Sequence, residues 1–398
     1  MDQSIPQTAD NPPARRETLR ELAVLFLRLG TLAMGGPAAH IAMMEDEVVR
    51  RRRWMTHDRF LDMLGVCNLI PGPNSTEMAI HIGQSRAGFA GLVVAGACFI
   101  LPAAAIVLVI AWMYVRYGAM PQAAGLLYGV KPVIIAVVLQ ALWGLGRTAI
   151  KSRMLAALAV AATAAALLDV DDMVVLLGGG IAMLAIRAAE NRARARAALA
   201  AIPTAAARAS GARAAALAAA VAVPFSLTTL FLFFLKVGAV LFGSGYVLLA
   251  FLRTDLVDRL RWLTQAQLLD AVAVGQITPG PVFTTATFIG YLLGGFRGAV
   301  VATLGIFLPS FFFVSISGPL IPHLRRSALA GAFLDGVNVG AWALMAAVTL
   351  FLARAAIVDV TTILLAASSA FILIRYRVNS AWLVLGGGLI GVAMTLWR

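Results

Sequence analysis

Charged residues are scarce in this chain. They make up 13% of its 398 positions, whereas 61% of the positions are hydrophobic. A soluble globule of this length needs more polar surface than such a composition supplies, and the mean hydropathy of +0.88 agrees. Apolar runs of about 20 residues, the length that a helix needs to cross a bilayer, recur along the sequence. We therefore predict an all-α integral membrane protein.

Cysteine and histidine are scarce as well. Cys67 and Cys98 form neither a CxxC pair nor a disulfide framework. The four histidines include no His-x-x-x-His spacing, and His40 beside the acidic run 45–47 matches no metal-ligand pattern. No metal and no cofactor are predicted.

Basic residues outnumber acidic ones, which gives a formal net charge of +13. The arginines lie in short clusters between apolar runs, as the orientation signals of membrane proteins do, and they are not interleaved with aromatic residues. We therefore predict a lipid bilayer as the partner of these clusters, and no binding to nucleic acid.

The most informative motif is a Pro-Gly-Pro break inside apolar sequence, which occurs twice. Pro71-Gly72-Pro73 is followed 208 residues later by Pro279-Gly280-Pro281. The flanking residues repeat as well. The matched pairs include Phe26 and Phe234, Gly30 and Gly238, Gly35 and Gly243, Trp54 and Trp262, Asp62 and Asp270, and, after one deletion, Pro102 and Pro309. Chance similarity between apolar helices does not align Trp, Asp, Pro and Gly in this way, so the chain consists of two homologous halves.

The repeat divides the chain into four parts. Residues 1–20 are polar, and we predict that they form a disordered cytoplasmic tail. Residues 21–188 and 230–398 are the two halves of the repeat. Between them, residues 189–229 comprise a linker rich in arginine and alanine and an extra apolar piece near 214–229, which we expect to be an additional transmembrane helix.

The distribution of Lys and Arg predicts that the two halves have opposite orientations in the membrane. If the linker is cytoplasmic, counting the crossings places Arg86 inside and Arg297 outside, although both flank the same repeat element. Basic residues on both sides of segment 22–44 favour a re-entrant hairpin there, and segment 60–84 has the same option. The simpler alternative is a continuous helix at 22–44, which leaves one basic cluster outside.

The two breaks have the chemistry that we expect of a substrate site. Proline stops one helix and suits the first turn of the next, so each break begins a half-helix. In a bilayer such irregular backbone usually lines a cavity, where the positive end of the half-helix stabilises an anion. The predicted anion-binding residues are Asn68, Pro71, Gly72, Pro73, Asn74, Ser75, Thr76, Gln276, Thr278, Pro279, Gly280, Pro281, Thr284 and Thr285. Further helix breaks are predicted at Gly35, Gly36, Pro37, Gly243 and Gly245. The alternative is that each Pro-Gly-Pro only kinks a packed helix.

Several charged or titratable residues lie within the apolar segments. Arg28 and Lys236 align in the repeat and are predicted to neutralise a divalent anion, or else to extend to the membrane interface. Glu77 and His81, about one helical turn apart beside the first break, are predicted to carry protons in coupled transport, with simple hydrogen bonding as the alternative. Asp270, like its repeat partner, is expected to make a capping or ion-pair contact.

These motifs resemble those of the chromate ion transporter family. In the first half the resemblance is carried by Phe26-x-x-x-Gly30, Met34-Gly35-Gly36-Pro37-Ala38-Ala39-His40, Trp54-Met55 and Pro71-Gly72-Pro73-Asn74-Ser75-Thr76. In the second half it is carried by Phe242-Gly243-Ser244-Gly245-Tyr246, Trp262-Leu263-Thr264 and Gly275-Gln276-Ile277-Thr278-Pro279-Gly280-Pro281. It covers nearly the whole chain from about Leu22, as in the long two-domain members. Met34 and Asn68 stand where the family usually has Phe and Gln, which bears on substrate preference.

The resemblance implies a secondary active transporter that exports chromate across the bacterial inner membrane and confers chromate resistance, with two halves of opposite topology. Chromate is a tetrahedral dianion like sulfate, so transport of sulfate or another oxyanion is the alternative. An integral membrane enzyme or scaffold is the remote alternative, because the sequence offers no catalytic constellation. The expected partners are the oxyanion and the bilayer, and assembly into a homodimer stays open.

Overall fold

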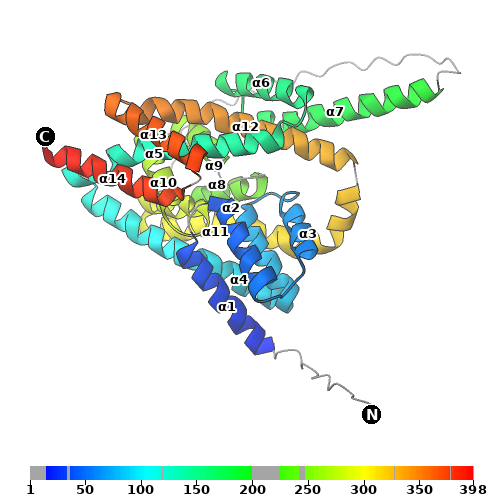
Figure 1. Ribbon diagram of the computed structural model, residues 1–398, viewed down its shortest axis with the longest axis horizontal. Helices are drawn as coiled ribbons and strands as arrows, with labels where there is room; N and C mark the ends of the chain where they lie inside the picture. The colour runs from blue at the N-terminus through cyan, green and yellow to red at the C-terminus, as the bar shows by residue number, and fades with distance from the viewer. Residues whose placement is uncertain are drawn as a thin grey trace, which may run out of the picture.

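A computed structural model describes residues 15–33, 36–118, 120–199, 225–241, 247–326, 328–376 and 378–397, and these residues contain helices and no strands (Figure 1). The first half of the repeat comprises α1 (Arg15–Leu32), α2 (Gly36–Glu45), η1 (Asp46–Arg51), α3 (His57–Cys67), α4 (Asn74–Tyr117), α5 (Pro121–Ala149), α6 (Arg153–Leu167) and α7 (Asp172–Leu199). The second half comprises α8 (Leu227–Val240), α9 (Leu248–Phe251), η2 (Leu252–Arg259), α10 (Gln265–Ile277), η3 (Val282–Thr284), α11 (Thr285–Arg326), α12 (Ala328–Ala356), α13 (Val360–Tyr376) and α14 (Ser380–Trp397).

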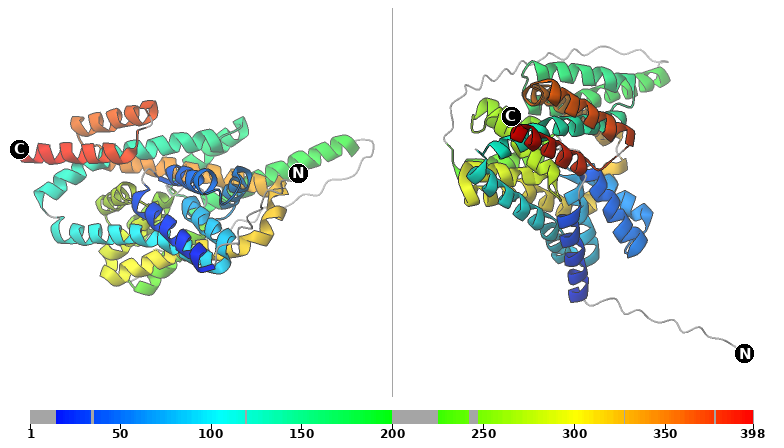
Figure 2. Two further views of the ribbon diagram at one scale, coloured as in Figure 1. Left: turned by 60° about the horizontal axis from the view of Figure 1, so that its bottom comes forward. Right: turned by 60° about the vertical axis from the view of Figure 1, so that its left-hand side comes forward.

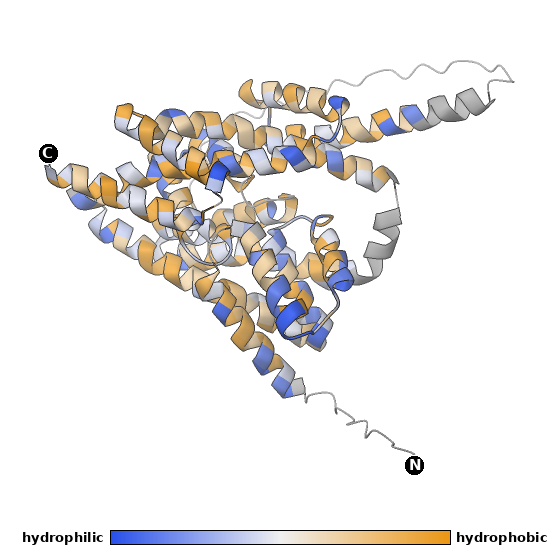
Figure 3. Cartoon of the chain, viewed as in Figure 1, coloured by the Kyte–Doolittle hydropathy of each residue, from blue (hydrophilic) through white to orange (hydrophobic). Residues whose placement is uncertain are grey.

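The composition of these helices confirms the membrane class. Six of them, among the described residues, are long and apolar enough to cross a bilayer. Large apolar side chains such as Leu101, Trp143 and Phe296 are more than 60% exposed, and hydrophobic residues cover the outer faces of the helices in Figure 3. Contact of such surfaces with lipid tails costs no free energy, whereas their contact with water is unfavourable. The chain is an all-α, multi-pass membrane protein built from two homologous halves.

The two longest helices, α4 and α11, contain the same interruption. In α4 it falls at Ala87 (φ −139°) and Gly88 (φ +61°), and in α11 it falls at Gly294 (φ −141°) and Gly295 (φ +58°). The chain reverses at these points. A Cβ atom on Gly83 would overlap the carbonyl oxygen of Gly91, eight residues further on, and the same is true of Gly290 and Gly298.

Each long helix is therefore a short helix followed by a long one. Residues 74–86 span about 20 Å at 1.5 Å per residue, which is too short to cross a hydrocarbon core of about 30 Å. Residues 89–117 span about 43 Å, which is long enough. The short helices are the ones that begin at the Pro-Gly-Pro breaks.

The two halves exchange their last helices. The fifth helix of the first half, α5, packs along α13 and α14, while α12, its repeat partner, packs along α6 and α7. Figures 1 and 2 show α14 running beside α5 and α7 running beside α12. The long helices α4 and α11 also pack against one another. The halves thus form one interlocked body.

Glycines allow the exchanged helices to approach closely. Gly129 of α5 lies against Gly387 of α14, and Gly179 of α7 lies against Gly336 of α12, with backbone carbonyls where a Cβ would stand. Because apolar side chains gain little by leaving lipid for protein, close backbone packing at small residues is a main source of helix association in membranes. Trp342 of α12 adds a hydrogen bond from its indole nitrogen to the carbonyl oxygen of Leu142, at 2.9 Å.

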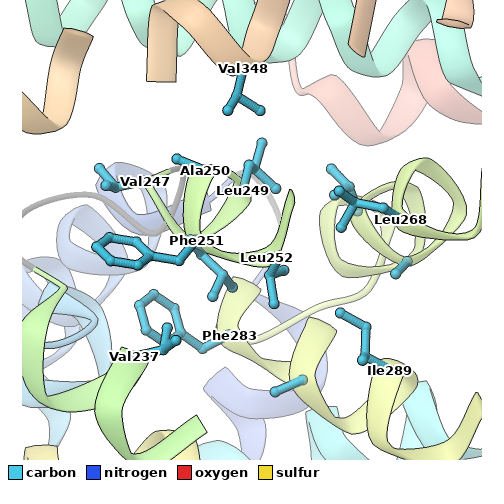
Figure 4. Packing of buried hydrophobic residues seen from close by; sticks show 14 of the residues in the cluster. Val237, Val247, Leu249, Ala250, Phe251, Leu252, Leu268, Phe283, Ile289 and Val348 are labelled. Carbon is cyan, nitrogen blue, oxygen red and sulfur yellow. The ribbon is translucent and has the colours of Figure 1, made fainter. Parts of the chain in front are cut away.

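The largest buried core surrounds the second break and takes most of its residues from the second half, with others from α4, α5, α6 and α7 of the first half. Phe251 and Leu252, where α9 passes into the π-helix η2, pack beside Phe283 of η3, Ile289 of α11 and Val348 of α12 (Figure 4). Each of these side chains is at most 5% exposed. This core holds the start of α11 against α9 and α12.

Some predicted features lie outside the described residues. These are positions 1–14 of the predicted tail, residues 200–224 of the predicted linker and extra helix, and the predicted helix breaks at Gly35, Gly243 and Gly245.

The glycine contact between α5 and α14 predicts a difference between two substitutions in one helix. Gly129→Ala should lower the thermal midpoint of the purified protein, because the new Cβ would overlap the carbonyl oxygen of Gly387, and overpacking of this kind costs about 1–3 kcal/mol. Gly144→Ala is the control, since no atom lies within 4 Å of its added Cβ. Equal midpoints for the two variants would contradict the glycine contact.

Candidate functional site

Each Pro-Gly-Pro motif separates two helices. The first helix, α3, ends at Cys67 and α4 begins at Asn74, while α10 ends at Ile277 and η3 begins at Val282. The prolines Pro73 and Pro281 precede the new helices in extended conformations, as expected from a residue whose φ is fixed and which donates no hydrogen bond. Two helix starts thus lie inside apolar sequence, one in each half.

Each break is held by the other half. The amide nitrogen of Gly72 donates to the carbonyl oxygen of Leu241, which follows α8, at 2.6 Å. The amide nitrogen of Gly280 donates to the carbonyl oxygen of Ala33, which follows α1, at 2.9 Å. Ala33 and Leu241 are equivalent positions of the repeat, so the two hydrogen bonds form a crossed pair.

Both break glycines are required by conformation and by space. Their φ angles are +140° at Gly72 and +85° at Gly280, a region that side chains other than glycine rarely adopt. A Cβ on Gly72 would lie 2.7 Å from the hydroxyl of Ser310 in α11, and one on Gly280 would lie 2.5 Å from the Cβ of Ala103 in α4. Ser310 and Ala103 are again equivalent, each following an aligned proline.

The first break contains a cluster of buried polar atoms. Thr76 and Glu77 are 0% exposed, and the Glu77 carboxylate lies where a Cβ of Gly72 would be. Among the described residues, neither carboxylate oxygen of Glu77 nor the hydroxyls of Thr76 and Ser310 have a hydrogen-bond partner. Buried polar atoms are costly without partners, so such a cluster calls for a proton, water or a ligand.

Three further polar side chains at the first break, Asn74, Ser75 and His81, make contacts, although the side-chain oxygen of Asn74 has no partner among the described residues. Asn74 donates from its side-chain nitrogen to the side-chain oxygen of Asn68 at 2.6 Å. The hydroxyl of Ser75 lies 3.4 Å from a ring nitrogen of His40. His81, further along α4, lies 3.5 Å from the hydroxyl of Ser317 in α11. These contacts join α3, α2 and α11 to the short helix that starts at Asn74.

At the second break the threonine hydroxyls donate to backbone carbonyl oxygens of the same segment. The hydroxyls of Thr278, Thr284 and Thr285 donate to the carbonyl oxygens of Val274, Pro281 and Val282, at 2.9, 2.8 and 2.8 Å. The side-chain nitrogen of Gln276 is buried and, among the described residues, lacks a partner. The breaks are thus equivalent in backbone but differ in chemistry, because the unpaired carboxyl belongs to the first break.

Arg28 and Lys236 are both engaged by carboxylates. Arg28 lies 3.5 Å from Glu47 of η1, and Lys236 lies 3.1 Å from Asp255 of η2. In each half a further arginine lies 3.4 Å from the same carboxylate, Arg51 in the first half and Arg259 in the second, and Arg52 also contacts Glu47 at 3.3 Å. The side chains of Arg28 and Lys236 are 58% and 40% exposed.

Beside the first of these clusters, Arg28, Glu47 and Arg51 line a cavity of about 360 Å³. The two cations therefore belong to matched ion clusters at the π-helices.

Gly36 and Pro37 lie at the start of α2, after a gap that follows α1. Gly36 has a φ of +79°, which fits the predicted helix break.

Sequence reasoning missed the residues that seat each break. The repeat alignment pairs Ser310 with Ala103, since each follows an aligned proline. It does not reveal that each residue contacts the break of the opposite half. The carboxylates of Glu47 and Asp255 were detectable as an aligned acidic pair. Their partners Arg28 and Lys236 precede them by 19 residues in both halves.

Comparison with known proteins identifies the family. The model of the chromate transporter family matches residues 20–184 and 228–392, one match in each half. The chain is similar to a chromate transport protein of Cupriavidus metallidurans, with 32% identity covering 94% of this chain and 93% of the relative. It is also similar to a chromate transport protein of Pseudomonas aeruginosa, with 34% identity covering 93% and 91% of the two chains.

A probable chromate transport protein of Synechococcus elongatus is 31% identical over 87% of this chain and 88% of the relative. No solved structure matches the chain. The duplicated helical architecture, the breaks and these matches together show that the chain belongs to the chromate transporter family.

Proposed function

We propose that this chain is a secondary active transporter that exports chromate across the bacterial inner membrane and confers chromate resistance. The observation that carries the proposal is the reciprocal seating of the two breaks, in which each glycine amide is bound by the opposite half. A transporter that alternates access needs a site shared by two bodies that move relative to one another. Chromate is proposed as the substrate because the relatives in Cupriavidus metallidurans and Pseudomonas aeruginosa are chromate transport proteins.

The anion site is proposed to lie between the helices that start at the breaks. The N-terminus of α4, and that of η3 with α11, carry the positive end of the helix dipole. Backbone amides at such N-termini bind oxyanions well. The break residues predicted from the sequence would line this site, and Arg28 and Lys236 would provide positive potential on the approach to it. Chromate and sulfate are both tetrahedral dianions, so sulfate or another oxyanion stays the alternative substrate.

Glu77 is the proposed coupling group. Its carboxyl is fully buried at the first break and lacks a hydrogen-bond partner among the described residues. A charged carboxylate would repel a dianion nearby, whereas a protonated one donates a hydrogen bond. Binding of the anion would thus favour uptake of a proton by Glu77, with His81 one turn further along α4 as the relay.

The proposed topology is an inverted repeat in which the breaks are entered as re-entrant hairpins from opposite sides. The length of helix 74–86 supports it, because a helix that begins at the break and is too short to cross the hydrocarbon core leads back to a surface, where the chain turns again at Ala87 and Gly88. The equivalent turn in α11 supports the same geometry in the second half.

Labelling from the two sides of the membrane checks the inversion. Phe89 and Phe296 occupy equivalent positions after the turns and are 72% and 64% exposed. In a background with Cys67 and Cys98 replaced by alanine, Phe89→Cys and Phe296→Cys should react with an impermeant maleimide from opposite sides. Reaction of both cysteines from the same side would rule out the inverted arrangement.

Transport itself is tested in inside-out membrane vesicles. We expect uptake of chromate without ATP, inhibition by collapse of the proton gradient, and weaker competition by sulfate than by unlabelled chromate. Absence of ATP-independent uptake would contradict the transporter proposal. Stronger competition by sulfate than by unlabelled chromate would identify sulfate as the preferred substrate.

The same vesicles test the role of Glu77. Glu77→Gln should abolish accumulation against a gradient but keep exchange of labelled for unlabelled chromate, because only the proton step is removed. Glu17→Gln, at an exposed position in α1, is the matched control and should behave like the unmodified protein. Normal proton-driven accumulation in Glu77→Gln would exclude the coupling role.

The requirement for glycine at the breaks is tested against a glycine that also has a positive φ but has open surroundings. Gly280→Ala should reduce transport at least tenfold, since it combines strain of about 1–2 kcal/mol with overlap of Ala103. Gly88→Ala also has a positive φ, but no atom lies within 4 Å of its added Cβ. Similar transport rates in the two variants, at equal amounts in the membrane, would separate the breaks from the mechanism.

A further inference from the structure

A cavity of about 350 Å³ lies between the two halves, is lined by none of the break residues, and contains an ion pair that is largely shielded from solvent. It is lined by the ends of α4 and α12, by α5 and by α10. Its polar side chains are Tyr114, Tyr128, Lys131 and Asp270, and the residues from α12, Ala355 and Ala356, are apolar. The cavity therefore combines one cation and one carboxylate with hydroxyl groups in apolar surroundings.

The ion pair joins the first half to the second. The Lys131 ammonium lies 2.9 Å from one carboxylate oxygen of Asp270, and the Tyr114 hydroxyl donates to the other oxygen at 2.8 Å. The side chains of Lys131 and Asp270 are 20% and 5% exposed. Lys131 lies within α5, one of the helices long enough to span the membrane. Charged side chains within membrane-spanning segments are energetically costly and are commonly associated with function.

The equivalent position of the other half carries no cation. Lys131 corresponds to Asn338 in the second half, and Asp270 corresponds to Asp62, which lies on an exposed part of α3. The backbone around Asn338 is nevertheless equivalent, with Gly336 packed on α7 as Gly129 is packed on α14. A lysine has thus been placed in one copy of a helix that packs equally well without it.

Stability gives little reason for such a pair. Removing two charges from water costs about as much as their attraction returns, so buried ion pairs are weak contributors to stability. In this cavity Lys131 is the only cation among the lining residues. An anion that enters competes with the Asp270 carboxylate for Lys131, and a dianion competes better than a monoanion because the Coulomb energy scales with charge.

Asp270 retains a hydrogen-bond donor when Lys131 leaves it. The Tyr114 hydroxyl continues to donate to it, and a hydrogen bond to a carboxylate is among the stronger kinds. The neighbouring hydroxyl of Tyr128 donates to Asp359 at 2.5 Å. No other titratable side chain of the described residues lines the cavity.

We propose that this cavity is a second anion site, in which Lys131 exchanges Asp270 for a divalent tetrahedral oxyanion. Asp270 acts as a built-in competitor that occupies Lys131 while the site is empty. The identity of the anion rests on the proposed chromate transport. The site itself rests on the ion pair, the cavity and the absence of the lysine from the repeat copy.

The proposal predicts opposite effects for the two members of the pair. Binding of radiolabelled chromate to purified protein is measured by equilibrium dialysis, at a pH where free chromate is fully deprotonated. Asp270→Asn should tighten binding, because the competitor is gone, and Lys131→Gln should weaken it, each by roughly tenfold. The double variant should bind as weakly as Lys131→Gln alone. Thermal midpoints establish that every variant is folded.

The matched control is Lys151→Gln. Lys151 also forms an ion pair between the halves, with Asp335 at 3.2 Å, but its side chain is 62% exposed, so its loss should leave chromate binding unchanged.

A purely structural ion pair gives a different pattern, which would overturn the proposal: both single variants weaken binding and the double variant recovers it. Equal binding by all the variants also rules out the site. If the unmodified protein binds neither chromate nor sulfate, the proposed substrate fails together with the site. If it binds sulfate alone, the same order of variants is expected with sulfate, and only the chromate assignment falls.

Discussion

The crossed hydrogen bonds from Gly72 to Leu241 and from Gly280 to Ala33 are the interactions on which the rest of the structure depends. A helix that stops inside a bilayer exposes backbone groups that lipid does not bind. Here each interrupted segment obtains a partner from the half to which it does not belong. Both breaks therefore depend on contact between the halves. Movement of one half relative to the other would change both hydrogen bonds.

The sequence predicted the features that come from unusual residue types. Proline lacks an amide hydrogen and clashes with the preceding turn of a helix, and glycine readily adopts positive φ, so the breaks at Pro71 to Pro73 and at Pro279 to Pro281 were predictable without a structure. The duplication was visible for the same reason, because Trp, Pro and Gly align where apolar residues alone would not. The helical membrane class followed from composition.

The contacts between the halves were not predictable. Ser310 lies against Gly72 and Ala103 lies against Gly280, yet neither residue is unusual, and no local pattern links positions so far apart. Arg28 and Lys236 were recognised as charges in apolar sequence, but their carboxylate partners in η1 and η2 were not assigned to them. A neighbouring carboxylate lowers the free energy needed to place a cation in apolar surroundings. The position of the cation in the sequence therefore does not decide between substrate binding and ion pairing.

The exchange of α13 and α14 onto α5, and of α6 and α7 onto α12, has a consequence for biosynthesis. During translation α5 is inserted before α14 is synthesised. The glycine face of α5 that packs on α14 is therefore exposed to lipid during this time. The first half therefore completes its packing only after most of the second has been inserted, and long waiting times of this kind favour contacts with the wrong chain. Gly125 and Gly129 of α5 lie against Gly391 and Gly387 of α14, with no room for a Cβ between the two backbones. Small residues spaced in this way promote helix association in membranes, so this face of α5 stays open to other helices until its own C-terminal helix has been inserted.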